Sequence, residues 1–173
     1  MKKVLLILLT ATLIASCGSS KKSRTVSVEG SPETNKEVRH KSKKASKEAD
    51  KIIKTALSYN GTPYKYGGTT KRGMDCSGLI YTSFKENDVA LQRASYMMAT
   101  EGKKISLKHV EEGDLLFFTT NKNSRRINHV GLVVSVKGKD IQFIHSTSSR
   151  GVLVSSLSEG YWNFAFNHAR RVL

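Results

Sequence analysis

The sequence predicts an α+β domain in which helices come first and an antiparallel sheet of about five strands follows. Between residues 46 and 57, apolar side chains recur at the spacing of one face of a helix. After Gly113-Asp114 the pattern changes to short segments rich in Val, Ile and Phe, separated by breaks that contain Gly or Ser and Asn. Strands that follow one another directly are expected to pair as antiparallel neighbours and to pack against the helices.

The first helix is the most clearly marked of the expected elements. Ala49, Ile52 and Leu57 belong to its apolar stripe, Ser46 is its expected cap, and Asn60-Gly61 is its expected stop. A helix of this kind buries one face against the rest of the domain. We therefore expect the ordered domain to begin at residue 46 and to continue to residue 173.

The remaining elements follow from glycine positions and from β-branched or aromatic runs. A glycine-dense loop, 61–73, precedes a second helix that begins at Asp75, and a short third helix is expected at 95–100. A hairpin turn is expected at 137–139. The expected strands are 115–119, 129–136, 140–145, 152–155 and 163–172.

The first residues have the pattern of an export signal. Lys2 and Lys3 precede an apolar run that is too short to span the roughly 30 Å core of a bilayer as a helix. Small residues then lead to Cys17, an arrangement that resembles the bacterial lipobox. This resemblance implies that residues 1–16 are removed and that Cys17 is acylated, which would tether the chain to a membrane. The alternative is an ordinary signal cut near Ser16, with Cys17 an incidental thiol.

Residues 17–45 are expected to form a flexible basic tether, because they are rich in Ser, Lys, Thr and Glu and carry almost no large apolar side chain. The whole chain has a formal net charge of +15. Nucleic acid is a possible partner of so basic a protein, but export makes it an unexpected one. Anionic lipid head groups and other acidic surfaces of the cell envelope are nearer. The lysines could equally serve only to keep the domain soluble.

Cys76 is the second of two cysteines, so a lipid on Cys17 would leave it without an intramolecular disulfide partner. It lies in the first turn of the second helix, where unpaired N–H groups and the helix dipole lower a thiol pKa. Asp75 would raise that pKa, but its carboxylate is expected to cap the helix. The competing interpretation is an inert, buried cysteine on the same face as Leu79 and Ile80.

Two of the five histidines are expected to lie together. His129 begins a strand and His145 ends the paired strand, so an antiparallel hairpin brings both imidazoles to one end of the sheet. Such a pair suits a base and the group that orients it. His40 lies in the expected tether, His109 in a surface stretch and His168 in a strand, where it is expected to pack against the sheet. Zinc ligation by the thiol and both imidazoles is the alternative, although no fourth ligand is evident.

Around these residues the sequence resembles the NlpC-type cell-wall cysteine peptidases, a papain-like clan. The resemblance rests on an ordered series of blocks that covers roughly residue 49 to the C terminus. The blocks are Gly61-Thr62-Pro63-Tyr64 with Gly67-Gly68, Asp75-Cys76-Ser77-Gly78-Leu79, Arg93 with Ser95, Gly113-Asp114-Leu115-Leu116-Phe117-Phe118, His129-Val130-Gly131-Leu132, Phe143-Ile144-His145, Tyr161-Trp162 and Ala169-Arg170-Arg171-Val172.

The resemblance implies a papain-like fold and a role for each matching residue. Cys76 would be the nucleophile, His129 the base and His145 the residue that holds the base. Tyr64 would help to stabilise the oxyanion, and Ser77, with Asp75 beside it, would lie on the substrate side. No metal or organic cofactor is implied.

The sequence departs from the family's pattern in two places. Met97-Met98 stand where relatives often carry glutamine, and Asn128 precedes the base histidine. Neither departure removes a catalytic group, but both affect the substrate subsites. The bond that is cut is therefore left open.

The implied activity is peptidoglycan endopeptidase, acting on stem peptides either between D-glutamate and diaminopimelate or at the diaminopimelate cross-link. Two alternatives remain: a non-hydrolytic cell-wall-binding lipoprotein, and acyl transfer or amide cleavage by the same fold. Gly18-Ser19 lacks the aspartate that retains some lipoproteins at the inner membrane. We therefore expect a monomeric lipoprotein of the outer membrane that faces the periplasm.

Overall fold

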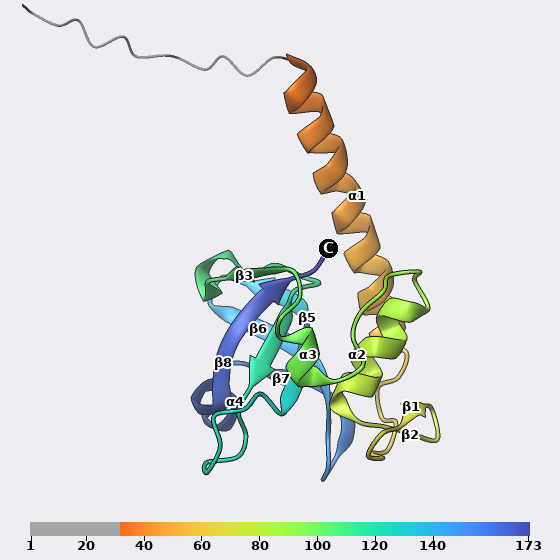
Figure 1. Cartoon of the computed structure of the whole chain (residues 1–173), viewed down its shortest axis with the longest axis vertical. Coiled ribbons are helices and arrows are strands. Elements are labelled where there is room, and N and C mark those ends of the chain that lie inside the picture. The colour runs from red at the N-terminus through yellow and green to blue at the C-terminus, as the bar shows by residue number, and fades with distance from the viewer. Residues whose placement is uncertain (1–31) are drawn as a thin grey trace, which may run out of the picture.

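A computed structural model describes residues 32–173, and its side chains from residue 43 onward. The expectations for residues 1–16, for Cys17, for most of the tether and for the side chain of His40 lie outside these residues. The elements, in chain order (Figure 1), are α1 (Pro32–Leu57), β1 (Thr69–Thr70), β2 (Gly73–Met74), α2 (Cys76–Lys85), α3 (Ser95–Met98), β3 (Lys103–Ile105), a short 3-10 helix (Leu107–His109), β4 (Leu115–Phe118), β5 (His129–Lys137), β6 (Asp140–Thr147), β7 (Gly151–Ser156), α4 (Gly160–Ala165) and β8 (Phe166–Arg171).

Helix α1 begins at Pro32 rather than near Ser46, so part of the segment that was expected to be flexible is helical. The segment is poor in apolar residues, which predicts a tether, but it is rich in Lys and Glu, which have high helix propensity. Proline is well suited to the first turn of a helix because that turn needs no N–H donor there. Figure 1 shows the N-terminal part of α1 extending away from the sheet, and only its last turns pack on the domain.

The main sheet has six antiparallel strands in the order β3-β8-β4-β5-β6-β7, which confirms the α+β class. The sheet has one strand more than expected, the short edge strand β3, which pairs with β8. The sequence does not indicate this strand, because it has no alternating apolar pattern of its own. The turn between β5 and β6 lies where the sequence predicted it, with Gly138 at a positive φ of 61°. Residues 163–165, expected in the last strand, belong instead to α4.

Two groups of buried side chains cover the two faces of the sheet. Strand β4 is buried along its whole length, with Leu115 and Phe117 in one group and Leu116 and Phe118 in the other. The first group includes the apolar stripes of α1 and α2, and the second includes Trp162 of α4. Both groups exclude water, so α2 on one face and α4 on the other are held near the same end of β5.

An ion pair with a buried carboxylate joins the beginning of β4 to the last strand. Asp114 is 2% exposed, and its carboxylate accepts two hydrogen bonds of 2.8 Å from the guanidinium of Arg171 in β8. It also accepts the backbone N–H of Glu111 at 2.7 Å. A bidentate pair of this kind fixes both the distance and the orientation of the two segments.

Among the helices that the structure describes, none combines the length and the apolar character needed to cross a membrane.

Candidate active site

Cys76 is the first residue of α2, and Asp75 is its N-cap. The Oδ1 atom of Asp75 accepts the backbone N–H of Gly78 at 2.6 Å, so the expected capping role is confirmed. Capping satisfies one of the unpaired N–H groups at the start of a helix and fixes the direction in which the helix begins. The position of the sulfur is therefore set by the first turn of α2.

Arg93 holds the same carboxylate from a loop that follows α2. Its guanidinium lies 3.2 Å from Asp75 Oδ1 and donates a hydrogen bond of 2.8 Å to the Ser77 hydroxyl. The backbone N–H of Gly67 donates to Asp75 Oδ2 at 2.7 Å. In the sequence, Arg93 is one of the residues that match the family pattern, and no contact is predicted for it. In the structure, Arg93 offsets the negative charge next to Cys76 and links the loop at Gly67 to α2.

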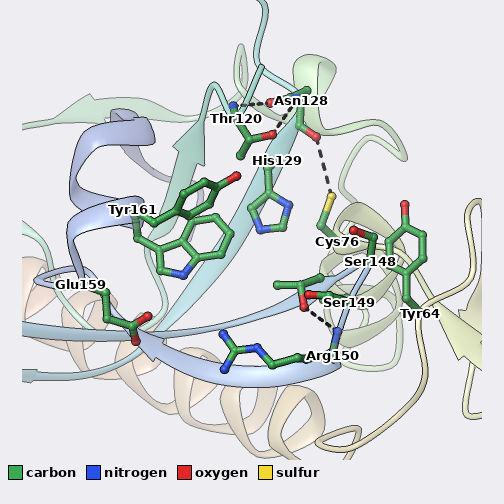
Figure 2. A pocket seen from close by; sticks show the side chains of 13 residues that line it. Tyr64, Cys76, Thr120, Asn128, His129, Ser148, Ser149, Arg150, Glu159 and Tyr161 are labelled. Atoms are coloured by element: carbon green, nitrogen blue, oxygen red, sulfur yellow. Dashed lines mark hydrogen bonds between the residues drawn. The ribbon is translucent and has the colours of Figure 1, made fainter. Parts of the chain in front are cut away.

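The Cys76 sulfur lies against the first residues of β5. It is 4.0 Å from the backbone oxygen of Asn128, and the backbone N–H of Val130 lowers the pKa of the thiol. The sulfur thus contacts the main chain at the residue before His129. Figure 2 shows the imidazole of His129 beside the sulfur, and both residues line one cavity of about 460 Å³. The structure therefore brings the predicted thiol and the predicted base together.

His129 and His145 are buried and hydrogen-bonded to each other, as the hairpin pattern predicted. His129 Nε2 and His145 Nδ1 are 2.9 Å apart, and His145 Nε2 is 3.1 Å from the hydroxyl of Ser155. Since Nε2 of His129 faces His145, its Nδ1 atom is the one that remains for the thiol. For Nδ1 to accept a proton, Nε2 must carry one and donate it to His145 Nδ1, and His145 Nε2 must then donate to Ser155.

Trp162 of α4 packs on both imidazoles. Its ring stacks on His129 with 5.1 Å between centroids and a 21° interplanar angle, and it meets His145 edge-on at 4.4 Å. These contacts fix the orientation of the His129 ring from the face opposite α2. No such role was predicted from the sequence for Trp162 or for Ser155. The pairing of Phe143 with Ser155 places Ser155 diagonally opposite His145, so the register of the hairpin could have indicated that contact.

The protonation states differ from the expectation of a favoured thiolate. Burial raises the pKa of the Cys76 thiol to about 11, and Asp75 adds to the rise, while nearby backbone N–H groups lower it only in part. Burial also lowers the pKa of His129 to about 4. The pKa of His145 falls to about 2, because of burial first and then the charges of His129 and Arg150. Burial thus favours a neutral thiol and two neutral imidazoles in the free protein.

Tyr64 lies on the other side of the sulfur from His129 (Figure 2). Burial raises its pKa, and Cys76 and Asp75 raise it further, so its hydroxyl stays protonated and can donate a hydrogen bond. Tyr64, Cys76 and Asn128 line not only the cavity described above but also a second hollow of about 680 Å³. Ser77, Arg93 and Asp75 line that second hollow. The sulfur is thus accessible from a groove that continues on both sides of it.

The other histidines lie away from the sulfur. His109 is exposed, as expected, and His168 stacks on Phe117 with 5.1 Å between centroids, which confirms its expected packing in the sheet. Within residues 43–173, no group of three or more His, Cys, Asp or Glu side chains converges as metal ligands would. The two site imidazoles bond to each other, which leaves the zinc interpretation without a ligand set in this region.

A thiol at a helix start, an imidazole base and a second group that holds the base form the arrangement of cysteine hydrolases. The sequence matches the NlpC/P60 family over residues 61–171, which is more than half of the chain. The chain belongs to the NlpC/P60 family.

Two relatives from Escherichia coli (strain K12) illustrate the similarity. The murein DD-endopeptidase MepS/murein LD-carboxypeptidase is 36% identical over 124 residues, which cover 71% of this chain and 62% of that protein. The probable endopeptidase NlpC is 40% identical over 116 residues, which cover 66% of this chain and 72% of the relative. The matched region therefore spans somewhat less than two thirds of the MepS protein.

Solved structures agree with the fold. An NlpC/P60 family protein from Bacillus cereus superposes with a TM-score of 0.64 at 31% identity, over 72% of this chain and 40% of that one. The NlpC/P60 domain of the peptidoglycan hydrolase SagA has a TM-score of 0.59 at 27% identity, over 71% of this chain and 97% of that domain.

The protonation of Cys76 can be measured by alkylation. At pH 7 we expect iodoacetamide to label Cys76 of the folded protein more slowly than it labels glutathione, because a thiol with a pKa of about 11 forms less thiolate than an ordinary thiol near 8.5. The rate should rise as the pH approaches 11. Mass spectrometry of the Cys76 peptide gives the rate, and urea-unfolded protein is the control. A half-maximal rate below pH 8 would contradict the expectation.

Proposed function

We propose that this protein is a peptidoglycan endopeptidase that hydrolyses stem-peptide bonds with Cys76 as nucleophile, His129 as base and His145 as the residue that holds the base. The observation that supports this most is the 4.0 Å contact of the Cys76 sulfur with the backbone oxygen of Asn128, the residue before His129, in a cavity that His129 also lines. The names of the relatives supply the substrate, since they describe murein and peptidoglycan hydrolases.

The first half of the reaction forms a thioester. His129 Nδ1 takes the thiol proton while the sulfur attacks the carbonyl carbon of the peptide bond, and the carbonyl oxygen becomes an oxyanion. Backbone N–H groups at the start of α2 and the Tyr64 hydroxyl are the available donors for this oxyanion. His129 then gives the proton to the leaving amine and the C–N bond breaks.

The second half releases the acyl product. Water enters the position of the amine, gives a proton to His129 and attacks the thioester, so that the C–S bond breaks and the thiol is formed again. His145 remains an acceptor throughout, because burial holds its pKa near 2 and keeps Nδ1 unprotonated. Burial disfavours both the thiolate and the protonated imidazole, so we expect the proton transfer to accompany the attack.

Digestion of purified peptidoglycan tests the proposal. The full-length chain in detergent should release muropeptide fragments that mass spectrometry can assign to one bond, and Cys76→Ala should release none. His145→Gln should lower the rate by about 10²-fold or more, because His129 loses the partner that fixes its tautomer.

The matched control replaces a histidine that lies away from the sulfur. His109 is exposed, so His109→Gln should retain the wild-type rate. Equal release by wild type and Cys76→Ala, or no release by either, would contradict the proposal. Transfer of the acyl group to an added amine in preference to water would favour the acyl-transfer alternative.

We also propose that Cys17 carries a lipid and that the protein faces the periplasm from the outer membrane of the cell envelope. The support is the run of small residues before Cys17 and the absence of aspartate in Gly18-Ser19. The wild-type chain should incorporate labelled palmitate and partition into the detergent phase, whereas Cys17→Ser should do neither. Sucrose-gradient fractionation separates inner from outer membranes, and recovery of the wild type in the inner membrane would contradict the location.

A further inference from the structure

The two hollows that meet at Cys76 have different roles in the proposed reaction, on which this inference rests. His129 must give its proton to the leaving amine, so the amine side of the substrate lies next to the imidazole. His129 and Trp162 line the cavity of about 460 Å³, whereas Ser77 and Arg93 line the other hollow. The first cavity therefore takes the residue on the amine side of the bond that is cut.

Two side chains of opposite charge line this amine-side cavity. Arg150 comes from the turn between β6 and β7, and Glu159 immediately precedes α4. Figure 2 shows both at the edge of the cavity away from Asn128, with the guanidinium extending from the turn towards the side on which Glu159 lies. Among residues 43–173 the ion pairs involve Arg93 and Arg171, so Arg150 and Glu159 do not form one with each other.

Both charged groups have bonding capacity that the described residues leave unused. Glu159 Oε1 accepts the backbone N–H of Ser156 at 2.9 Å, which holds the carboxylate at its position while Oε2 makes no such bond. Arg150 is bonded only through its backbone N–H, to the hydroxyl of Thr147 at 3.1 Å. The remaining walls near them carry the neutral hydroxyls of Ser148 and Ser149.

One positive and one negative group on the same cavity favour a ligand that carries both charges. A ligand with only a carboxylate would be repelled by Glu159, and one with only an ammonium group would be repelled by Arg150. We propose that Arg150 and Glu159 form an amine-side subsite that binds the free carboxylate and the free ammonium group of a zwitterionic amino-acid side chain.

This subsite distinguishes the two bonds considered above. When the bond between D-glutamate and diaminopimelate is cut, the distal end of diaminopimelate in an uncross-linked stem carries both a carboxylate and an ammonium group. At the cross-link, the distal amine is itself the leaving group, and the other amine of that residue is acylated, so no ammonium group is available for Glu159. The pair therefore selects uncross-linked stems and the bond to diaminopimelate.

Three synthetic peptides test the subsite: L-Ala-γ-D-Glu-diaminopimelate, the same peptide with its distal carboxylate amidated, and the same peptide with its distal amine acetylated. We expect the full-length protein to cut the unmodified peptide with a kcat/KM about tenfold higher than either modified one. Arg150→Gln should lose discrimination against the amide but keep discrimination against the acetyl group. Glu159→Gln, which keeps an acceptor for Ser156, should show the reverse.

Arg125→Gln is the matched control, because Arg125 is exposed and does not line the cavity, and it should keep both preferences. The opposite patterns of the two variants separate loss of a contact from loss of folding. Equal kcat/KM for all three peptides would overturn the subsite while leaving the proposed hydrolysis intact. Cys76-dependent digestion of peptidoglycan without cleavage of any of these peptides would also overturn it. No digestion of either substrate would instead contradict the proposed function.

Discussion

The position of the Cys76 sulfur against the beginning of β5 is the constraint on which the proposed chemistry depends. The thiol is carried by a helix and the proposed base by the sheet, so the packing of α2 on β5 and β6 sets their distance. Asp75 fixes the first turn of α2 through Gly78 and Arg93. The buried hydroxyl of Ser146 in β6 donates to the backbone oxygen of Met74 at 2.8 Å, which ties the chain just before α2 to the sheet.

The burial that positions these groups also sets their charge. Shielding a thiol in part and two imidazoles almost fully from water disfavours every charged form, which raises the pKa of Cys76 and lowers those of His129 and His145. A neutral His145 is useful in this position, because only an unprotonated Nδ1 can accept the hydrogen bond that keeps His129 in the tautomer able to take a proton. The thiolate and the protonated His129 are thus expected to form only once substrate is bound.

Local patterns predicted the parts of the site that depend on neighbours in sequence. The cap at Asp75, the helix at Cys76 and the hairpin that joins His129 to His145 follow from spacing and turn chemistry, and the structure confirms them. Contacts between distant segments were not predicted: Arg93 on Asp75 and Trp162 on His129 depend on how α2 and α4 pack on the sheet. The expected shift in the pKa of Cys76 was wrong in direction, because a helix terminus is visible in the sequence whereas burial is not.

The histidine tautomers test the central claim most directly, because they report both the hydrogen-bond chain and the absence of charge. Long-range ¹H–¹⁵N NMR spectra of the free protein, assigned with His129→Gln and His145→Gln, distinguish the neutral forms from the imidazolium. The account predicts that both imidazoles are neutral at about pH 6.5 and that both carry their proton on Nε2, since the pKa values are about 4 and about 2. A doubly protonated His129 at that pH, paired with a thiolate, would contradict it.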